Sequence, residues 1–148
     1  MRNVEVTASV AGRTASELFP LLCDMEQYPK NSAAIIGLTV ASSENGSSIS
    51  TWTVRFGHGV ATWREEDYFD LPATTIRFKR LSGDIESFSG AWVLRDNENG
   101  CTIQFAADFD IGLPALASFI EPMIENTLRE NITAILKGIL GERTVIHA

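Results

Sequence analysis

The first residues of the chain alternate between apolar and polar side chains. The apolar positions are Val4, Val6, Ala8 and Val10. Successive side chains of a strand point to opposite faces, so a period of two makes one face apolar and the other polar. The pattern predicts a half-buried strand over residues 3–10.

The next segment has the pattern of a short helical elbow. Thr14 and Glu17 have the spacing of a capping box, which satisfies free backbone N–H groups at the start of a helix, and a mostly apolar run follows. Because the residue before a proline avoids the helical conformation, Tyr28-Pro29 is expected to end the last turn. We therefore predict a helical elbow over residues 14–30.

Six short apolar or alternating segments follow, and turn residues separate them. The segments cover residues 36–40, 52–56, 60–69, 74–81, 88–94 and 101–109. The turns between them fall on Ser42 to Ser48, Gly57-His58-Gly59, Asp70 to Ala73, Ser82-Gly83-Asp84 and Asp96 to Gly100. Strands joined by such short turns pair with their neighbours, so the pattern predicts an antiparallel meander.

The longest periodic segment of the chain runs from Pro114 to Leu140 and predicts a helix. Its apolar stripe consists of Leu116, Phe119, Ile120, Met123, Ile124, Leu128, Ile132, Ile135, Leu136 and Ile139. A stripe with helical spacing faces a core. Pro122 would bend the helix because it lacks a backbone N–H, and Gly141 supplies a stop. His147 is expected in a frayed tail.

The alternation in each strand also predicts which side chains face this helix. They are Trp52, Val54, Phe56, Ile76, Phe78, Arg80, Phe88, Gly90, Trp92, Leu94, Ile103, Phe105 and Phe109. Residues 60–69 fit either phase, and we favour the face of Trp63 as the inward one. That choice places Glu65, Asp67 and Arg80 among aromatic rings, where a charge needs a partner, solvent or a ligand.

A strongly curved sheet around one long helix leaves space between the two layers. An apolar cavity with a few convergent polar groups is the usual form of a small-molecule site. A second interpretation stays open, in which Trp52, Trp63 and Trp92 are core residues whose indole N–H groups bond the backbone.

The composition narrows the class of protein. The 148 residues, 45% of them apolar, suit one globular domain over residues 1–148. We find neither a membrane-spanning run nor a secretory signal, so a cytoplasmic location is the default expectation. The net charge of −7 and the absence of a basic stripe argue against a nucleic-acid partner. Cys23 and Cys101 form no metal-binding or disulfide motif and are expected to be free thiols.

The order of these elements resembles the START-like helix-grip superfamily, which includes polyketide cyclases and aromatases, coenzyme Q-binding proteins and the birch-pollen allergen type. The sequence segments that carry the resemblance are Glu26-Gln-Tyr-Pro29, Trp63 to Asp70, Ile76-Arg-Phe78, Gly83-Asp84 leading to Trp92, and Leu113-Pro114. The resemblance implies an α+β fold, in which a curved antiparallel sheet of about seven strands wraps around the long C-terminal helix.

Within this superfamily the chain looks most similar to the bacterial polyketide aromatase/cyclases. That likeness implies a poly-β-ketone, free or bound to an acyl carrier, that closes a ring inside the cavity without metal or cofactor. The pocket tryptophans of those enzymes match Trp63 and Trp92, their aromatic residue before a proline matches Tyr28, and a pocket arginine matches Arg80. The sequence departs from them at Asp67, which stands where those enzymes carry a further arginine.

These residues suggest an acid–base site. Aldol ring closure needs a base and a donor that stabilises the enolate; Glu65 or Asp67 could be the base, and Arg80 or Tyr28 the donor. An ion pair between Asp67 and Arg80 across adjacent strands is the alternative. The expected substrate contacts are Tyr28, Trp52, Phe56, Trp63, Phe78, Trp92, Phe105, Leu116 and Met123.

Three functional hypotheses follow from the sequence. The first is a cofactor-independent cyclase/dehydratase that acts on a poly-β-ketone. The second is a non-catalytic carrier of a lipid, quinone or other hydrophobic molecule, which the aspartate at position 67 favours. In the third, residues 114–140 form a partner-binding surface, for example in a homodimer.

Overall fold

The computed structural model describes residues 1–42 and 46–147. The middle of the predicted turn from Ser42 to Ser48 lies outside these residues. The elements are β1 (Arg2–Ala11), α1 (Ala15–Cys23), a single 3-10 turn η1 (Met25–Gln27), α2 (Tyr28–Asn31), β2 (Ile35–Ser42), β3 (Ser47–Phe56), β4 (Gly59–Asp70), β5 (Thr75–Gly83), β6 (Ser87–Asn97), β7 (Gly100–Asp110), α3 (Pro114–Leu140) and β8 (Val145–His147).

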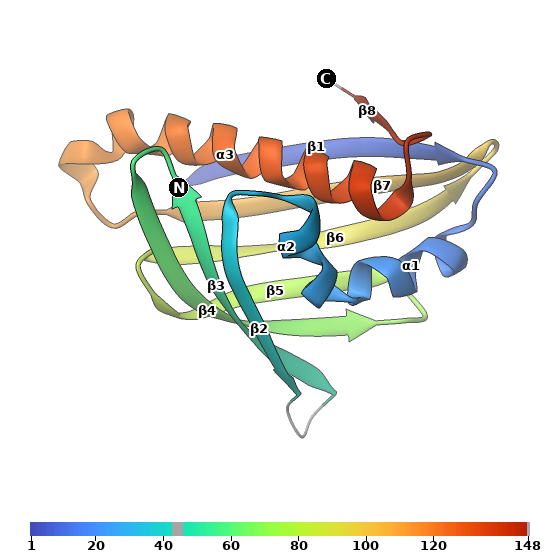
Figure 1. Cartoon of the computed structure of the whole chain (residues 1–148), viewed down its shortest axis with the longest axis horizontal. Helices are drawn as coiled ribbons and strands as arrows, with labels where there is room; N and C mark the ends of the chain where they lie inside the picture. The colour runs from blue at the N-terminus through green and yellow to red at the C-terminus, as the bar shows by residue number, and fades with distance from the viewer. Residues whose placement is uncertain (43–45, 148) are drawn as a thin grey trace.

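The described strands form one antiparallel sheet in the order β2-β3-β4-β5-β6-β7-β1-β8. From β2 to β7 each strand pairs with the next strand along the chain, which confirms the predicted meander. β1 joins the far side of β7. The sheet curves around α3, and α1 and α2 lie at the open side of the curve (Figure 1). This is the helix-grip arrangement that the order of the elements predicted.

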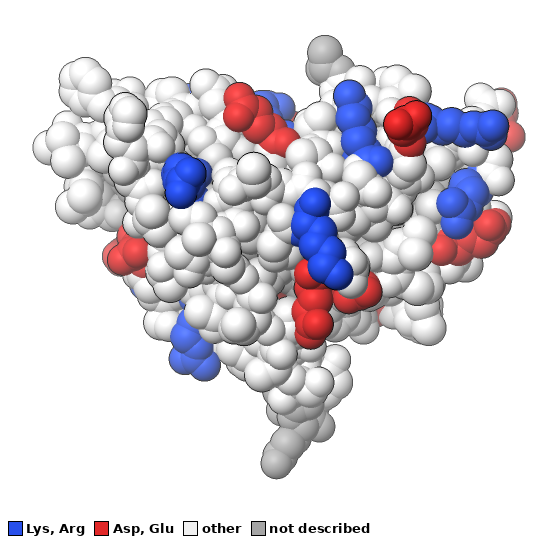
Figure 2. Space-filling view, viewed as in Figure 1, with Lys and Arg blue, Asp and Glu red and all other residues white. Residues whose placement is uncertain are grey.

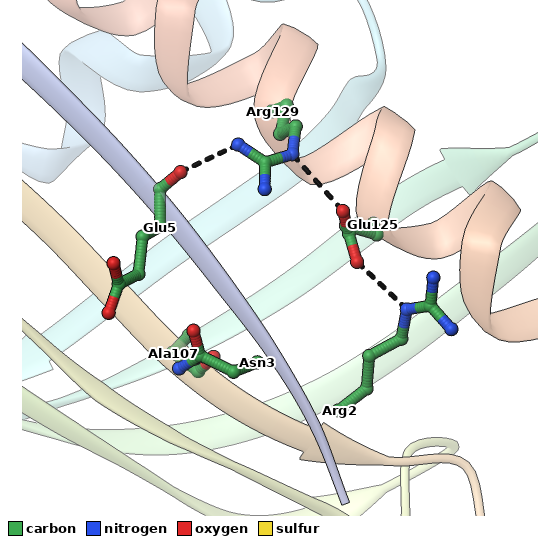
Figure 3. Close-up of polar contacts among 6 residues, drawn as sticks. All are labelled: Arg2, Asn3, Glu5, Ala107, Glu125 and Arg129. Carbon is green, nitrogen blue, oxygen red and sulfur yellow. Dashed lines mark hydrogen bonds and ion pairs between the residues drawn. The ribbon is translucent and has the colours of Figure 1, made fainter. Parts of the chain in front are cut away.

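Polar contacts attach the middle of α3 to β1 (Figure 3). Glu125 accepts a hydrogen bond from Arg2 at 2.8 Å and one from Arg129 at 3.2 Å. Arg129 also donates to the backbone carbonyl oxygen of Glu5 at 2.7 Å. These contacts fix the polar face of α3 over β1, so that the opposite face of the helix points into the concave side of the sheet.

The helical elbow begins as predicted and ends differently. The capping box is present, since Glu17 N donates to the Thr14 hydroxyl at 3.2 Å and Thr14 N donates to the Glu17 carboxylate at 3.3 Å. Tyr28-Pro29 was expected to end a helical turn, but it begins α2 instead. Proline is tolerated in the first turn of a helix because no intrahelical partner awaits its missing N–H there.

The last helix has the predicted bounds, but its apolar stripe is not buried along its whole length. Burial begins at Ile124. Leu116 is 46% and Phe119 is 79% exposed, which contradicts the prediction that they face the core. The first turns of α3 extend past the sheet (Figure 1), and on the face drawn in Figure 2 the tip of this end shows only uncharged residues.

The C-terminal segment forms a strand, contrary to the expectation of a frayed tail. β8 pairs with β1, where His147 lies opposite Thr7. The imidazole Nε2 of His147 and the hydroxyl of Ser9 form a hydrogen bond of 2.6 Å. The outer edge of β1 is free to pair because β7 occupies its other edge. The described sheet therefore has eight strands instead of about seven.

Candidate functional site

A small cavity lies between the sheet, the elbow and α3, with a volume of about 50 Å³. Ordinary ligand pockets enclose roughly 300–1,000 Å³, so a ligand of more than a few atoms requires some wall side chains to move. The lining residues are Met25, Tyr28, Ile35, Trp52, Val54, Trp63, Glu65, Asp67, Ile76, Phe78, Phe88, Trp92, Phe105, Leu128, Asn131, Ile132 and Ile135.

The inward face of β4 is the one that carries Trp63. Trp63 is 3%, Glu65 3% and Asp67 0% exposed, whereas Arg64 and Tyr68 on the other face are exposed. This confirms the phase that we favoured for residues 60–69. Two carboxyl groups therefore lie two residues apart on one buried face of a strand.

Aromatic rings from several strands and the elbow form most of the cavity wall. Trp52 and Trp63 stand opposite each other on β3 and β4, and their rings stack with centroids 5.9 Å apart. Tyr28 of α2 lies 6.0 Å from Trp52 and 6.1 Å from Trp92, measured between ring centroids. Phe105 packs edge-on against Trp92 at 4.9 Å. The rings exclude water and lower the local dielectric, which strengthens every electrostatic interaction inside.

The two carboxyl groups are held by hydrogen bonds from their neighbours. The indole N–H of Trp63 donates to Glu65 Oε1 at 2.9 Å. Ser50 donates to Asp67 Oδ2 at 2.6 Å and accepts from the indole N–H of Trp52 at 2.9 Å. The second oxygen of Asp67, Oδ1, is buried and bonds no atom within residues 1–42 and 46–147. An acceptor with this environment is costly unless the neighbouring Glu65 carboxyl shares its proton with Asp67 or a ligand supplies a donor.

The surroundings favour the protonated forms of both acids. Burial raises the pKa of Glu65 well above its usual range, and the neighbouring Asp67 raises it further, while the hydrogen bond from Trp63 lowers it in part. Burial also raises the pKa of Asp67, although Glu65 and Ser50 oppose this rise. Two carboxyl groups that share one site cannot both ionise easily. The pair is therefore suited to hold a proton and to exchange it with a bound molecule.

Both donors expected from the sequence bond backbone groups instead. Tyr28 lines the cavity, but its hydroxyl donates to the carbonyl oxygen of Leu22 at 2.6 Å. Arg80 lies outside the cavity lining and donates to the carbonyl oxygen of Gly83 at 2.8 Å.

The expected ion pair between Asp67 and Arg80 is absent among the described residues. The register places Arg80 opposite Glu65, beside a bulge between β4 and β5. A bulge bends the strand that carries it, and here the Arg80 guanidinium bonds Gly83 at the end of β5.

The structure brings most of the predicted site residues together. The predicted residues that line the cavity are Tyr28, Trp52, Trp63, Glu65, Asp67, Phe78, Trp92 and Phe105. Four others do not line it, namely Phe56, Arg80, Leu116 and Met123. Phe56 is buried and packs against Trp63, with ring centroids 6.4 Å apart. Met123 lies at the turn between β3 and β4, where a Cβ on Gly57 would approach its sulfur to 2.6 Å.

Helix α3 contributes a polar residue that the sequence analysis missed. Leu128, Asn131, Ile132 and Ile135 line the cavity, with the spacing of one helical face. Asn131 is 7% exposed, and its Oδ1 accepts a hydrogen bond of 2.5 Å from Ser32. Its place on the apolar stripe is a weak signal in the sequence, because its partner Ser32 lies far away in the chain.

Two further features are absent from the part of the chain that the structure describes. No group of three or more His, Cys, Asp or Glu side chains that could hold a metal ion lies within residues 1–42 and 46–147. Within the same ranges, every helix is too short or too polar to cross a membrane.

Solved structures share this fold at low sequence identity. A protein from Thermus thermophilus matches with a TM-score of 0.82 and 20% identity over 96% of each chain. The Zhui aromatase/cyclase from Streptomyces sp. R1128 matches with a TM-score of 0.78 and 18% identity, over 96% of this chain and 93% of that one. A START superfamily protein from Mycobacterium smegmatis matches with a TM-score of 0.73 and 19% identity, over 92% of this chain and 94% of that one.

A match to a protein-family model assigns the chain to a family, whereas the solved structures at such low identity share only its fold. No curated protein sequence matches the chain. A family model described as "Polyketide cyclase / dehydrase and lipid transport" matches residues 12–136, a range that begins before the elbow and ends within α3. The chain therefore belongs to the START-like family of polyketide cyclases, dehydrases and lipid-transport proteins.

Proposed function

We propose that the chain binds a poly-β-ketone or a related apolar ketone in the cavity and promotes aldol ring closure and dehydration through Glu65 and Asp67. The observation that carries this proposal is the pair of buried carboxyl groups, with Asp67 Oδ1 unpartnered among the described residues, inside an aromatic cavity. Membership of a family of cyclases, dehydrases and lipid-transport proteins supports the same class of ligand.

The chemistry begins with proton removal. A buried pair of carboxyl groups holds one proton between its members over a range of pH. Asp67, in its ionised form, takes a proton from the carbon next to a carbonyl group, and the electron pair of that C–H bond moves into an enolate. The enolate carbon then attacks a second carbonyl carbon of the same molecule. A C–C bond forms, and the new alkoxide takes the proton from Asp67.

Loss of water completes the ring. Asp67 removes the remaining proton from the carbon beside the ketone, and Glu65 gives its proton to the departing hydroxyl group, so that water leaves and a C=C bond forms. The proton on Asp67 then passes to Glu65, which restores the pair. General acid–base catalysis of this kind contributes roughly 10²–10⁴-fold to a rate.

A short unbranched diketone that closes to a cyclohexenone tests this proposal. We expect the purified protein to accelerate formation of the cyclohexenone, followed by NMR. Asp67→Asn and Glu65→Gln should each lower the rate by about 100-fold or more, because each removes one member of the proton-transfer pair. Glu66→Gln is the matched control, since Glu66 lies between them on β4 with its side chain on the opposite face.

Unchanged rates in Asp67→Asn and Glu65→Gln would rule out this mechanism. A specific observation favours the second candidate, a non-catalytic carrier of an apolar molecule. Tyr28 and Arg80, the two expected carbonyl donors, each donate to a backbone oxygen, and Arg80 lies outside the cavity lining. A carrier would retain an apolar molecule through purification, visible by native mass spectrometry, and would give no cyclohexenone.

A further inference from the structure

The amide of Asn131 and the indole N–H of Trp92 are the two cavity-lining donors that have no acceptor among the described residues. The hydroxyl of Tyr28 and the indole N–H groups of Trp52 and Trp63 already donate to protein oxygens. Asn131 uses only its carbonyl oxygen Oδ1, which accepts from Ser32. Within residues 1–42 and 46–147, no atom accepts a hydrogen bond from its Nδ2.

The position of Asn131 makes this free donor significant. The side chain is 7% exposed and lies on the apolar cavity face of α3, between Leu128 and Ile132. Nδ2 is not fully enclosed, unlike Oδ1 of Asp67, and a ligand acceptor in the cavity would give it a hydrogen-bond partner. Ser32 follows α2 and fixes the amide through a hydrogen bond of 2.5 Å, so the orientation of the donor is set from a second element.

The cavity therefore offers two opposite kinds of polar contact from two different layers. Asp67 on the sheet presents an unpartnered acceptor, Oδ1, and Asn131 on the helix presents an unpartnered donor, Nδ2. Both line one cavity of about 50 Å³. A ligand that spans them needs a carbonyl oxygen for the amide and, close by, an acidic C–H or an enol O–H for the carboxylate.

We infer that Asn131 binds the carbonyl oxygen of the ligand and that Ser32 positions its amide, so that the site selects a ketone with an acidic C–H or enol O–H beside the carbonyl. This inference rests on the proposed function and deepens it, because it names the group that polarises the carbonyl. During proton removal by Asp67, the amide N–H stabilises the negative charge that develops on that oxygen.

Two probes of nearly equal shape test the inference without any turnover. Acetophenone and α-methylstyrene differ in having C=O or C=CH₂ on the same ring, so only acetophenone accepts a hydrogen bond. Binding is followed by NMR through the tryptophan indole signals, since Trp52, Trp63 and Trp92 line the cavity. We expect the wild-type protein to bind acetophenone roughly fivefold more tightly, as one net hydrogen bond predicts.

Three variants separate the donor from its surroundings. Asn131→Leu keeps the approximate shape and Asn131→Ala removes the amide with the smallest change in chemistry, so both lose the N–H donor, and we expect both to bind the two probes equally within about twofold. Ser32→Ala should reduce the preference for acetophenone, because the amide is then free to turn. Asn126→Leu is the matched control on an exposed position of α3 and should keep the wild-type preference.

The outcomes are distinct from those of the ring-closure experiment. An equal affinity of the wild-type protein for both probes, or a preference for acetophenone that survives in a folded Asn131→Leu or Asn131→Ala protein, would overturn the inference. If Asn131→Leu does not fold, Asn131→Ala decides alone. Loss of ring closure with an intact probe preference would refute the proposed reaction and leave the carbonyl contact of Asn131 standing.

Discussion

At the scale of residues, neighbouring acids on β4 lie in opposite environments. Glu65 and Asp67 are buried, whereas Glu66 between them lies on the outer face, where it accepts hydrogen bonds from Ser47 and Tyr68. The alternation of a strand produces this difference without any change in residue type. Burial thus raises the proton affinity of Glu65 and Asp67.

The raised pKa values predict how stability depends on pH. A carboxyl group whose pKa is higher in the folded than in the unfolded protein stabilises the fold below its ordinary pKa, and this contribution is lost as pH rises through the raised value. For Glu65 and Asp67, the loss of this stabilisation begins at the pH where carboxyl groups ordinarily ionise and continues as the pH rises further. We expect Glu65→Gln to flatten the decline in stability between about pH 5 and about pH 8.

Urea unfolding at the two ends of this pH range measures the effect as the difference between the midpoint urea concentrations. Glu66→Gln should follow the pH dependence of the wild-type protein closely, because the charge of Glu66 is the smallest of the influences on the pKa of Asp67. An equal decline in stability with pH in the Glu65→Gln and wild-type proteins would mean that Glu65 is not held protonated by burial.

At the scale of elements, α3 has two parts with different roles. Leu128 is 7% and Leu116 46% exposed, although both belong to the same apolar stripe in the sequence. Arg2 and Arg129 fix the helix near Glu125, which lies close to the point where burial begins. The part after Ile124 closes the cavity, and the part before it extends past the sheet (Figure 1).

Identical substitutions in the two parts test this division. We expect Leu128→Ala to lower the free energy of unfolding by roughly 2–5 kcal/mol, because it removes buried methyl groups and leaves a void. Leu116→Ala should change it by no more than about 0.5 kcal/mol, as for most surface positions. Chemical denaturation measures both values. Equal losses would show that the start of α3 is packed as tightly as its middle.

The sequence predicted the helices and strands better than it predicted how far they cover one another. Local rules were sufficient for the capping box at Thr14 and for the inward phase of Trp63, since both depend on residues close together in the chain. The exposure of Leu116 depends on how far the sheet reaches along α3, which periodicity does not contain. The orientation of Arg80 depends on a bulge between two strands, and no local sequence pattern predicted that bulge.

At the scale of the whole molecule, the site exists only where three parts of the chain meet. The elbow supplies Tyr28, the sheet supplies Glu65 and Asp67, and α3 supplies Asn131. The resemblance to the START-like superfamily anticipated this architecture and most of the aromatic wall. It did not identify Asn131, because a single polar residue on an apolar stripe becomes informative only when its partner Ser32, far away in sequence, is known.

The size of the cavity places a condition on any function of the molecule. At about 50 Å³, the cavity is smaller than a polyketide chain, so binding requires displacement of wall side chains. Close-packed aromatic rings resist such movement. Small ketones are therefore the ligands with which the chemistry of the carboxyl pair is measured most directly.

Exchange of the methyl protons of acetophenone in heavy water, followed by NMR, tests the central claim that the buried pair removes a proton beside a carbonyl group. We expect the wild-type protein to accelerate exchange above the buffer rate, Asp67→Asn to lose about 100-fold of that acceleration, and Glu66→Gln to match wild type. Exchange in Asp67→Asn as fast as in the wild-type protein would contradict the claim.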